Sequence, residues 1–282
     1  MDLGLNKESR KDEFIENPRK SMWKLAVPMM LGMSVQAIYM LVDTAFIGRW
    51  VGPTGLAGMG YIFPFMFFLM GITFGLGSGA TSVIAKYIGA EQKKYADNAA
   101  EHTIILGLFI YGIMILFLFF AGEWLIKFQG ADETAAKAGM DYFSIMILGS
   151  IFMILGVFFR SILSGEGDNV FPMKVLGIGT ILNIVLDYPF IKYYGIKGAA
   201  AATIISQGLV FSIFVYYLIV KHHSYITFQL HDFKFNSKIL SDIFKIGMPA
   251  SFSMIIMSSG VLIYNVILVS NDAVAAYQTA RR

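Results

Sequence analysis

The chain has 282 residues, of which 56% are hydrophobic and only 15% are charged, and its mean hydropathy is +0.65. Soluble domains usually contain about one-quarter charged residues, so this composition excludes an ordinary soluble protein and predicts a polytopic membrane protein with the lipid bilayer, not nucleic acid, as its partner. The net charge of +3 is small, and the absence of cysteine excludes disulfides, thiolate metal sites and cysteine nucleophiles.

The first 20 residues are polar and charged and lack the apolar core of a signal peptide, so we expect a cytoplasmic tail. Seven apolar stretches follow, each about as long as a spanning helix or longer. They lie at about 22–48, 56–85, 102–121, 142–163, 172–191, 198–220 and 247–270. None alternates like a β-strand, which predicts an all-α integral membrane protein. Lys and Arg gather in the tail and in the loops on its side, which places the N-terminus in the cytoplasm and the chain in the cell membrane.

The seventh stretch repeats the first. The segment "WKLAVPMMLGM" (23–33) matches "FKIGMPASFSM" (244–254) at the Lys, Pro and final Met positions. Six helices separate the two starts, so both copies enter from the same side and the repeat is parallel. We expect a six-helix transmembrane lobe over 21–220, a basic cytoplasmic loop over 221–246, and over 247–282 a seventh helix that starts an incomplete C-terminal lobe. The chain would then be a truncated transporter that lacks this second lobe.

Two apolar stretches contain a carboxylate. The first stretch has Asp43 four residues after Tyr39 ("AIYMLVDTAF"), and the fifth has Asp187 four residues after Asn183 ("LNIVLDYPF"). At this spacing each carboxylate shares a helix face with an oxygen-bearing neighbour. A charged side chain in the bilayer costs about 3 kcal/mol on insertion scales, so the default interpretation is function. Facing each other, with the hydroxyl of Thr203, the two pairs would form an oxygen-lined pocket for a proton or a small hard cation. The alternative is that either aspartate lies at a helix end and reaches water.

Other motifs indicate structure and not chemistry. Glycines recur every four residues over 71–79, which is typical of close helix packing. The "SGEGD" segment (164–168) reads as a turn. His222, His223 and His231 lie in the basic loop, where a solvated loop is favoured over a metal site because no further ligand is suitably spaced. No nucleophile elbow, glycosidase carboxylate pair or metalloprotease motif is present, so we do not expect an enzyme.

Together, "LAVPMMLGMSVQAIYMLVDTAFIGRWVG", "GLGSGATSVIAKYIGA", "RSILSGEGDN" and "LNIVLD" resemble the multidrug and toxic compound extrusion (MATE) transporters, in particular their DinF-like branch. The resemblance runs from about residue 18 to the end of the chain. It implies a twelve-helix multidrug antiporter of two lobes that exports organic cations in exchange for protons or sodium, without a bound cofactor. This chain resembles the first lobe and the seventh helix.

The resemblance also implies roles for individual residues. Asp43 is similar to the family's first-helix carboxylate, whose protonation or cation binding is tied to substrate release. The residues similar to its partners in a proton or sodium site are Asp187, Asn183, Tyr39 and Thr203.

Three further residues would line the substrate cavity by the same resemblance: Gln36, Ser206 and Arg160. Arg160 departs from the family, which can have an asparagine there. A cation at this position could form an ion pair with either aspartate or compete with sodium, which leaves the coupling ion open between proton and sodium. Two alternatives stay open beside the antiporter half. One is a truncated membrane fragment that does not transport, and the other is a flippase for lipid-linked precursors from the same superfamily.

Overall fold

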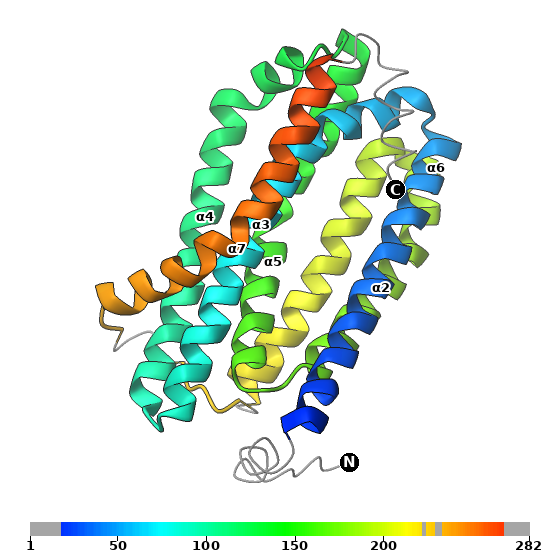
Figure 1. Ribbon diagram of the computed structural model, residues 1–282. Coiled ribbons are helices and arrows are strands. Elements are labelled where there is room, and N and C mark those ends of the chain that lie inside the picture. Colours follow the sequence, from blue (N-terminus) through cyan, green and yellow to red (C-terminus); the bar gives the residue numbers. More distant parts are fainter. Residues whose placement is uncertain (1–17, 222–223, 229–232, 268–282) are drawn as a thin grey trace.

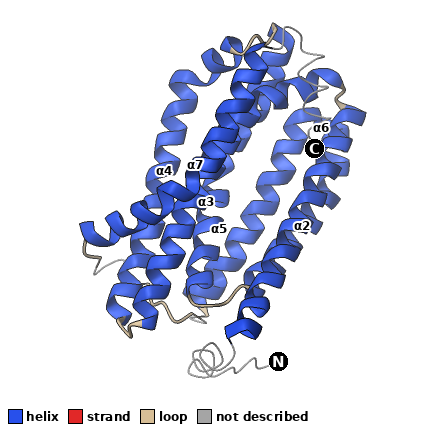
Figure 2. Cartoon of the chain, in the orientation of Figure 1, coloured by secondary structure: helices blue, strands red, loops and turns tan. Residues whose placement is uncertain are grey.

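The computed structural model describes residues 18–221, 224–228 and 233–267, and every regular element in them is a helix (Figure 1, Figure 2). The elements are α2 (Pro18–Trp50), α3 (Pro53–Gly89), α4 (Lys93–Phe128), α5 (Glu133–Gly165), α6 (Val170–Val215), the π-helical turn η1 (Tyr216–Val220) and α7 (Ser237–Ile267). The all-α prediction is therefore confirmed. The predicted tail over 1–17, the three histidines of the loop and the chain after 267 lie outside the described residues.

Five helical segments are long and apolar enough to cross a membrane: Pro53–Gly89, Lys93–Phe117, Glu133–Gly165, Val170–Val220 and Ser237–Ile267. The fourth has 51 residues, which as one straight helix would measure about 75 Å, more than twice the thickness of the bilayer core.

That long segment is a hairpin of two helices. The helical backbone breaks at Gly195, whose φ of 58° and ψ of −137° are accessible to glycine and strained for other residues. We call residues 170–194 the first limb of α6 and residues 196–215 its second limb. A Cβ added at Gly198 would lie 2.0 Å from the carbonyl oxygen of Phe190, so the limbs are in backbone contact beside the turn. The separate stretches predicted at 172–191 and 198–220 are confirmed as these limbs.

Helix α3 lies at the centre of the bundle and packs against α4, α5 and α7, while α6 packs between α5 and α2 (Figure 1). The predicted glycine packing over 71–79 is confirmed. A Cβ added at Gly75 would lie 1.9 Å from the hydroxyl oxygen of Ser251, and one at Gly79 would lie 2.2 Å from the carbonyl oxygen of Ile243. Only glycine lets α3 and α7 approach this closely.

The prediction of a loop over 221–246 is too long, because α7 begins at Ser237. The side chain of Asn236 accepts the backbone N–H groups of Lys238 and Ile239 at 3.1 and 3.3 Å, which caps the first turn. Lys and Asp residues lower the hydropathy of this first part of α7, so a search for apolar stretches of membrane-spanning length begins the helix too late. Pro249 lies inside the helix, and Figure 1 shows that α7 is bent.

The segment before α7 is held against the bundle by a carboxylate. Glu166, in the predicted "SGEGD" turn between α5 and α6, accepts hydrogen bonds from the Ser224 hydroxyl and from the backbone N–H groups of Tyr225 (3.0 Å) and Ile226 (3.1 Å). Gly167 has a φ of 80°, as the turn requires. The turn interpretation of this motif is confirmed.

Candidate functional site

The hairpin of α6 brings three of the predicted site residues together. The amide of Asn183 donates to Asp187 Oδ1 at 3.4 Å. With the amide in the reverse orientation, which satisfies both of its polar atoms, it donates to Oδ2 at 3.2 Å and accepts the backbone N–H of Thr203 at 3.2 Å. Asp187 is fully buried, and Asn183 is 3% exposed. The alternative in which Asp187 lies at a helix end in water is therefore wrong.

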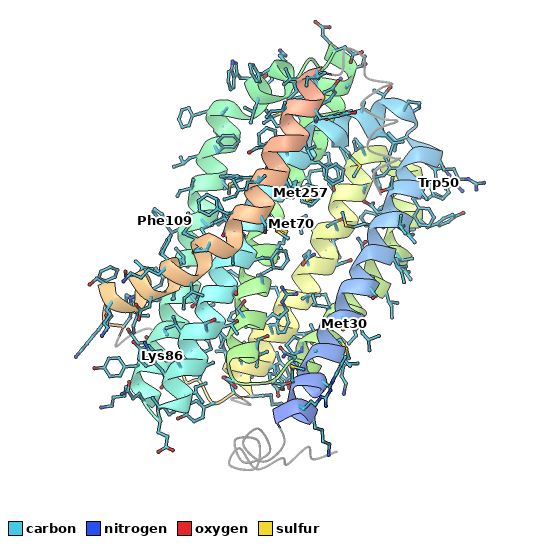
Figure 3. All side chains as sticks on the ribbon, viewed as in Figure 1. Met30, Trp50, Met70, Lys86, Phe109 and Met257 are labelled. Atoms are coloured by element: carbon cyan, nitrogen blue, oxygen red, sulfur yellow. The ribbon has the colours of Figure 1, made fainter. Side chains whose placement is uncertain are left out.

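Helix α2 places Asp43 beside this cluster. Trp50, labelled on α2 in Figure 3, contacts Tyr188 of the first limb edge to face, with 5.5 Å between ring centroids. Asp43 lies two turns before Trp50 and is 5% exposed. Its carboxylate acts electrostatically on Asp187, the neighbour of Tyr188. The two carboxylates singled out by their rarity thus come from different helices to one buried place.

A small cavity opens between the two limbs of α6. Its volume is about 30 Å³, and its lining includes Asn183, Thr203 and Ser206 together with Thr180 and Gln207. A water molecule needs roughly 10–15 Å³ by this measure, whereas drug-sized ligands occupy several hundred. The cavity therefore has room for water or a small cation and not for an organic substrate.

The hydroxyl groups of Thr203 and Ser206 donate to the carbonyls of Ala199 and Ala202 at 3.0 and 2.9 Å. Each hydroxyl oxygen keeps lone pairs that can face a cation or water. With the carboxylates, the cluster is a set of hard oxygen donors, the ligand type that small hard cations prefer. Such a donor set can hold a proton or a small hard cation such as sodium.

Two further predicted residues, Tyr39 and Gln36, belong to α2, and their side chains lie outside the described part of the structure. Arg160 is partly buried on α5, and its guanidinium carbon lies 5.1 Å from the centroid of the Phe74 ring of α3. Among the described residues it forms no ion pair with a carboxylate, so the expected pairing with an aspartate is replaced by a cation–π contact.

Sequence reasoning missed Thr180 and Gln207. Thr180 precedes Asn183 by three residues, and Gln207 follows Thr203 by four, so helical spacing places each on the face of a predicted residue. This spacing was the available signal. Uncharged polar side chains are too common in membrane helices to single out by rarity alone.

The sequence pattern of the MatE family matches residues 28–189, more than half of the chain, and this range includes Asp43, Asn183 and Asp187. The chain belongs to the MatE family. This confirms the resemblance to the MATE transporters. As a MatE protein, the chain belongs to a family of membrane transporters and is not an enzyme.

Similar proteins agree with this assignment. A Thermotoga maritima protein described as a probable multidrug resistance protein, NorM, is 29% identical over 96% of the chain. The outward-facing structure of a multidrug resistance MATE transporter is 37% identical over 86% of the chain, with a TM-score of 0.82. An inward-facing structure is 35% identical over 93% of the chain, with a TM-score of 0.85. The chain spans 59% of the length of the Thermotoga relative, and 54% and 60% of the two solved chains.

Proposed function

We propose that this chain forms the ion-coupling lobe of a transporter that exports small organic cations in exchange for protons or sodium. The observation that carries the proposal is the buried pair Asp43 and Asp187 on two different helices, with Asn183 hydrogen-bonded to one of them. Carboxylates inside a membrane protein are costly and mark ion pathways. Two that interact electrostatically favour the binding of one positive charge between them.

Exchange follows from competition for this negative charge. When a proton or sodium ion binds at Asp43 and Asp187, the site holds less negative charge and attracts an organic cation less strongly. Linkage makes the effect reciprocal, so the bound organic cation lowers the affinity for the ion by the same factor. The chain's own contribution is to hold the two carboxylates, Asn183 and Thr203 in one place while the ion binds and leaves.

The buried charges of the site favour a cationic substrate over a lipid-linked precursor. A diphosphate group would need several Lys or Arg side chains for charge-assisted hydrogen bonds. The buried charged residues of the cluster are the carboxylates Asp43 and Asp187, and Arg160 lies over Phe74. The charge at the site is negative, which suits an organic cation.

The proposal is tested by the binding of tetraphenylphosphonium to the purified full chain in lipid nanodiscs. We expect acid or sodium to weaken this binding, and Asp43→Asn to remove the dependence on the ion. Asp141→Asn is the matched control, because Asp141 is a partly exposed carboxylate that pairs with Lys197 at 3.2 Å outside the cluster. An Asp43→Asn protein with the ion dependence of the parent would refute the proposed coupling site.

A further inference from the structure

A proline in α3 leaves a backbone carbonyl that α7 satisfies. Pro64 has no N–H, so the carbonyl of Gly60, four residues earlier, lacks its helical donor. The side-chain amide of Asn265 on α7 donates to this oxygen at 2.9 Å. Ser258, two turns earlier on α7, donates to the carbonyl of Pro64 itself at 2.5 Å. Both contacts at the proline therefore come from the same face of α7.

Gln129, at the end of α4, extends this network. Its amide nitrogen donates to the carbonyls of Tyr61 (2.9 Å) and Leu125 (3.2 Å), and its amide oxygen accepts a second hydrogen bond from Asn265 at 3.0 Å. Gln129 and Asn265 are fully buried, and Ser258 is 5% exposed. The network joins three helices through hydrogen bonds at one end of the α3–α7 contact.

The other end of the contact is built differently. Beyond Met70 and Met257, labelled near the middle of this contact in Figure 3, α3 and α7 meet through glycines. A Cβ at Gly71 would lie 2.8 Å from Met254 Cβ, and those at Gly75 and Gly79 would overlap α7 still more closely. Packing of this kind holds helices together in lipid, where no hydrophobic effect drives association.

The hydrogen-bonded end and the glycine end of the α3–α7 contact differ in the free energy that separating the two helices requires. Hydrogen bonds to carbonyls and amides can be exchanged for bonds to water with a small net loss, whereas close-packed backbones lose their contacts without replacement. The Asn265 Oδ1 atom is buried and accepts no hydrogen bond within the part of the chain that the structure describes. Hydration of this atom on opening would offset part of the loss.

We propose that Ser258, Asn265 and Gln129 form a polar latch that holds α7 against α3. Opening would break these bonds and move the part of α7 after Met254 away from α3, while the glycine contacts before it stay closed. The latch goes beyond the ion site and rests on the proposed transport function, since only a transporter needs this contact to open.

Single cysteines report the opening directly, because the chain contains none of its own. Val261, 3% exposed, lies on the face of α7 between the two latch residues, and Ile243, fully buried, lies on the glycine half. Each is replaced by Cys in the full chain, in lipid nanodiscs, and labelled with a water-soluble maleimide. Asn265→Leu removes the amide with little change in size. We expect it to accelerate labelling at 261 at least about tenfold, equivalent to about 1.4 kcal/mol, and to leave labelling at 243 unchanged.

Ser258→Ala is a second, gentler variant that removes one hydrogen bond and should accelerate labelling at 261 about threefold to tenfold. Unchanged labelling at 261 in both variants would overturn the latch. Equal acceleration at 261 and 243 would also overturn it, because it would mean that the whole α3–α7 contact loosens and not the latch alone. Tetraphenylphosphonium binding to the same samples reports the proposed function separately. A failed latch leaves that binding intact, whereas a failed transport function abolishes it in the parent chain.

Discussion

Replacement of Gly198 by alanine should force the two limbs of α6 to separate. The added Cβ would lie 2.0 Å from the carbonyl oxygen of Phe190, and ordinary contact begins at 3.4 Å, so the limbs must separate by about 1.4 Å. The obstructing atoms belong to the backbone and cannot rotate away. Because the Asn183 to Thr203 hydrogen bond joins the same limbs further along, the separation also weakens the ion site.

The cost can be worked out from these contacts. Overpacking costs about 1–3 kcal/mol, and loss of the Asn183 to Thr203 bond adds about 1 kcal/mol. The higher helix propensity of alanine stabilises the folded protein by about 1 kcal/mol, which leaves a net destabilisation of roughly 1–3 kcal/mol. We expect Gly198→Ala to lower the Tm of the purified protein by several degrees and to weaken the effect of sodium or acid on tetraphenylphosphonium binding.

The matched control is Gly177→Ala on the first limb, where a Cβ meets no atom within 4 Å. It gains the same helix propensity without the overlap, so its Tm should equal or slightly exceed that of the parent. Thermal unfolding followed by size-exclusion fluorescence compares the two variants. If Gly198→Ala matched Gly177→Ala in both Tm and ion dependence, the proposed packing of the hairpin would be refuted.

Two further predictions concern the rest of the bundle. Gly75→Ala should lower the Tm by several degrees, because its Cβ would overlap Ser251 and lie 2.7 Å from the Gly247 carbonyl oxygen. Gly112→Ala is the control and should leave the Tm unchanged, because its Cβ would meet no atom within 4 Å. Equal Tm values for the two variants would contradict the packing of α3 on α7. Glu166→Gln removes the carboxylate that accepts hydrogen bonds from backbone N–H groups in the segment before α7. Trypsin should therefore cleave at Lys221 several-fold faster than in the parent protein. An unchanged cleavage rate would show that the carboxylate does not hold this segment.

The sequence predicted the helices well because their signal is local. An apolar stretch of membrane-spanning length needs no partner to be recognised, and the break at Gly195 fell between two such stretches. The start of α7 was missed because Lys238, Asp242 and Lys245 lower the hydropathy there, while Asn236 gives a capping signal that hydropathy does not contain.

The candidate site was predictable to the extent that its residues are rare. A carboxylate in a membrane helix stands out, so Asp43 and Asp187 could be found without coordinates. The contact between Asn265 and Gln129 could not be predicted from the sequence, because it joins residues 136 positions apart through uncharged side chains. The resemblance to the MATE transporters placed Arg160 near the aspartates, and its contact with Phe74 depends on the packing of α5 against α3.

We propose that the buried cluster around Asp187 couples an ion to the export of an organic cation. The most direct test reconstitutes in liposomes the transporter of which this chain is proposed to form one lobe, and measures ethidium transport driven by an imposed proton or sodium gradient. The account predicts gradient-driven transport by the parent and by the Asp141→Asn control, and none by Asp187→Asn at equal amounts of folded protein. Gradient-driven transport by Asp187→Asn at the rate of the parent would contradict it.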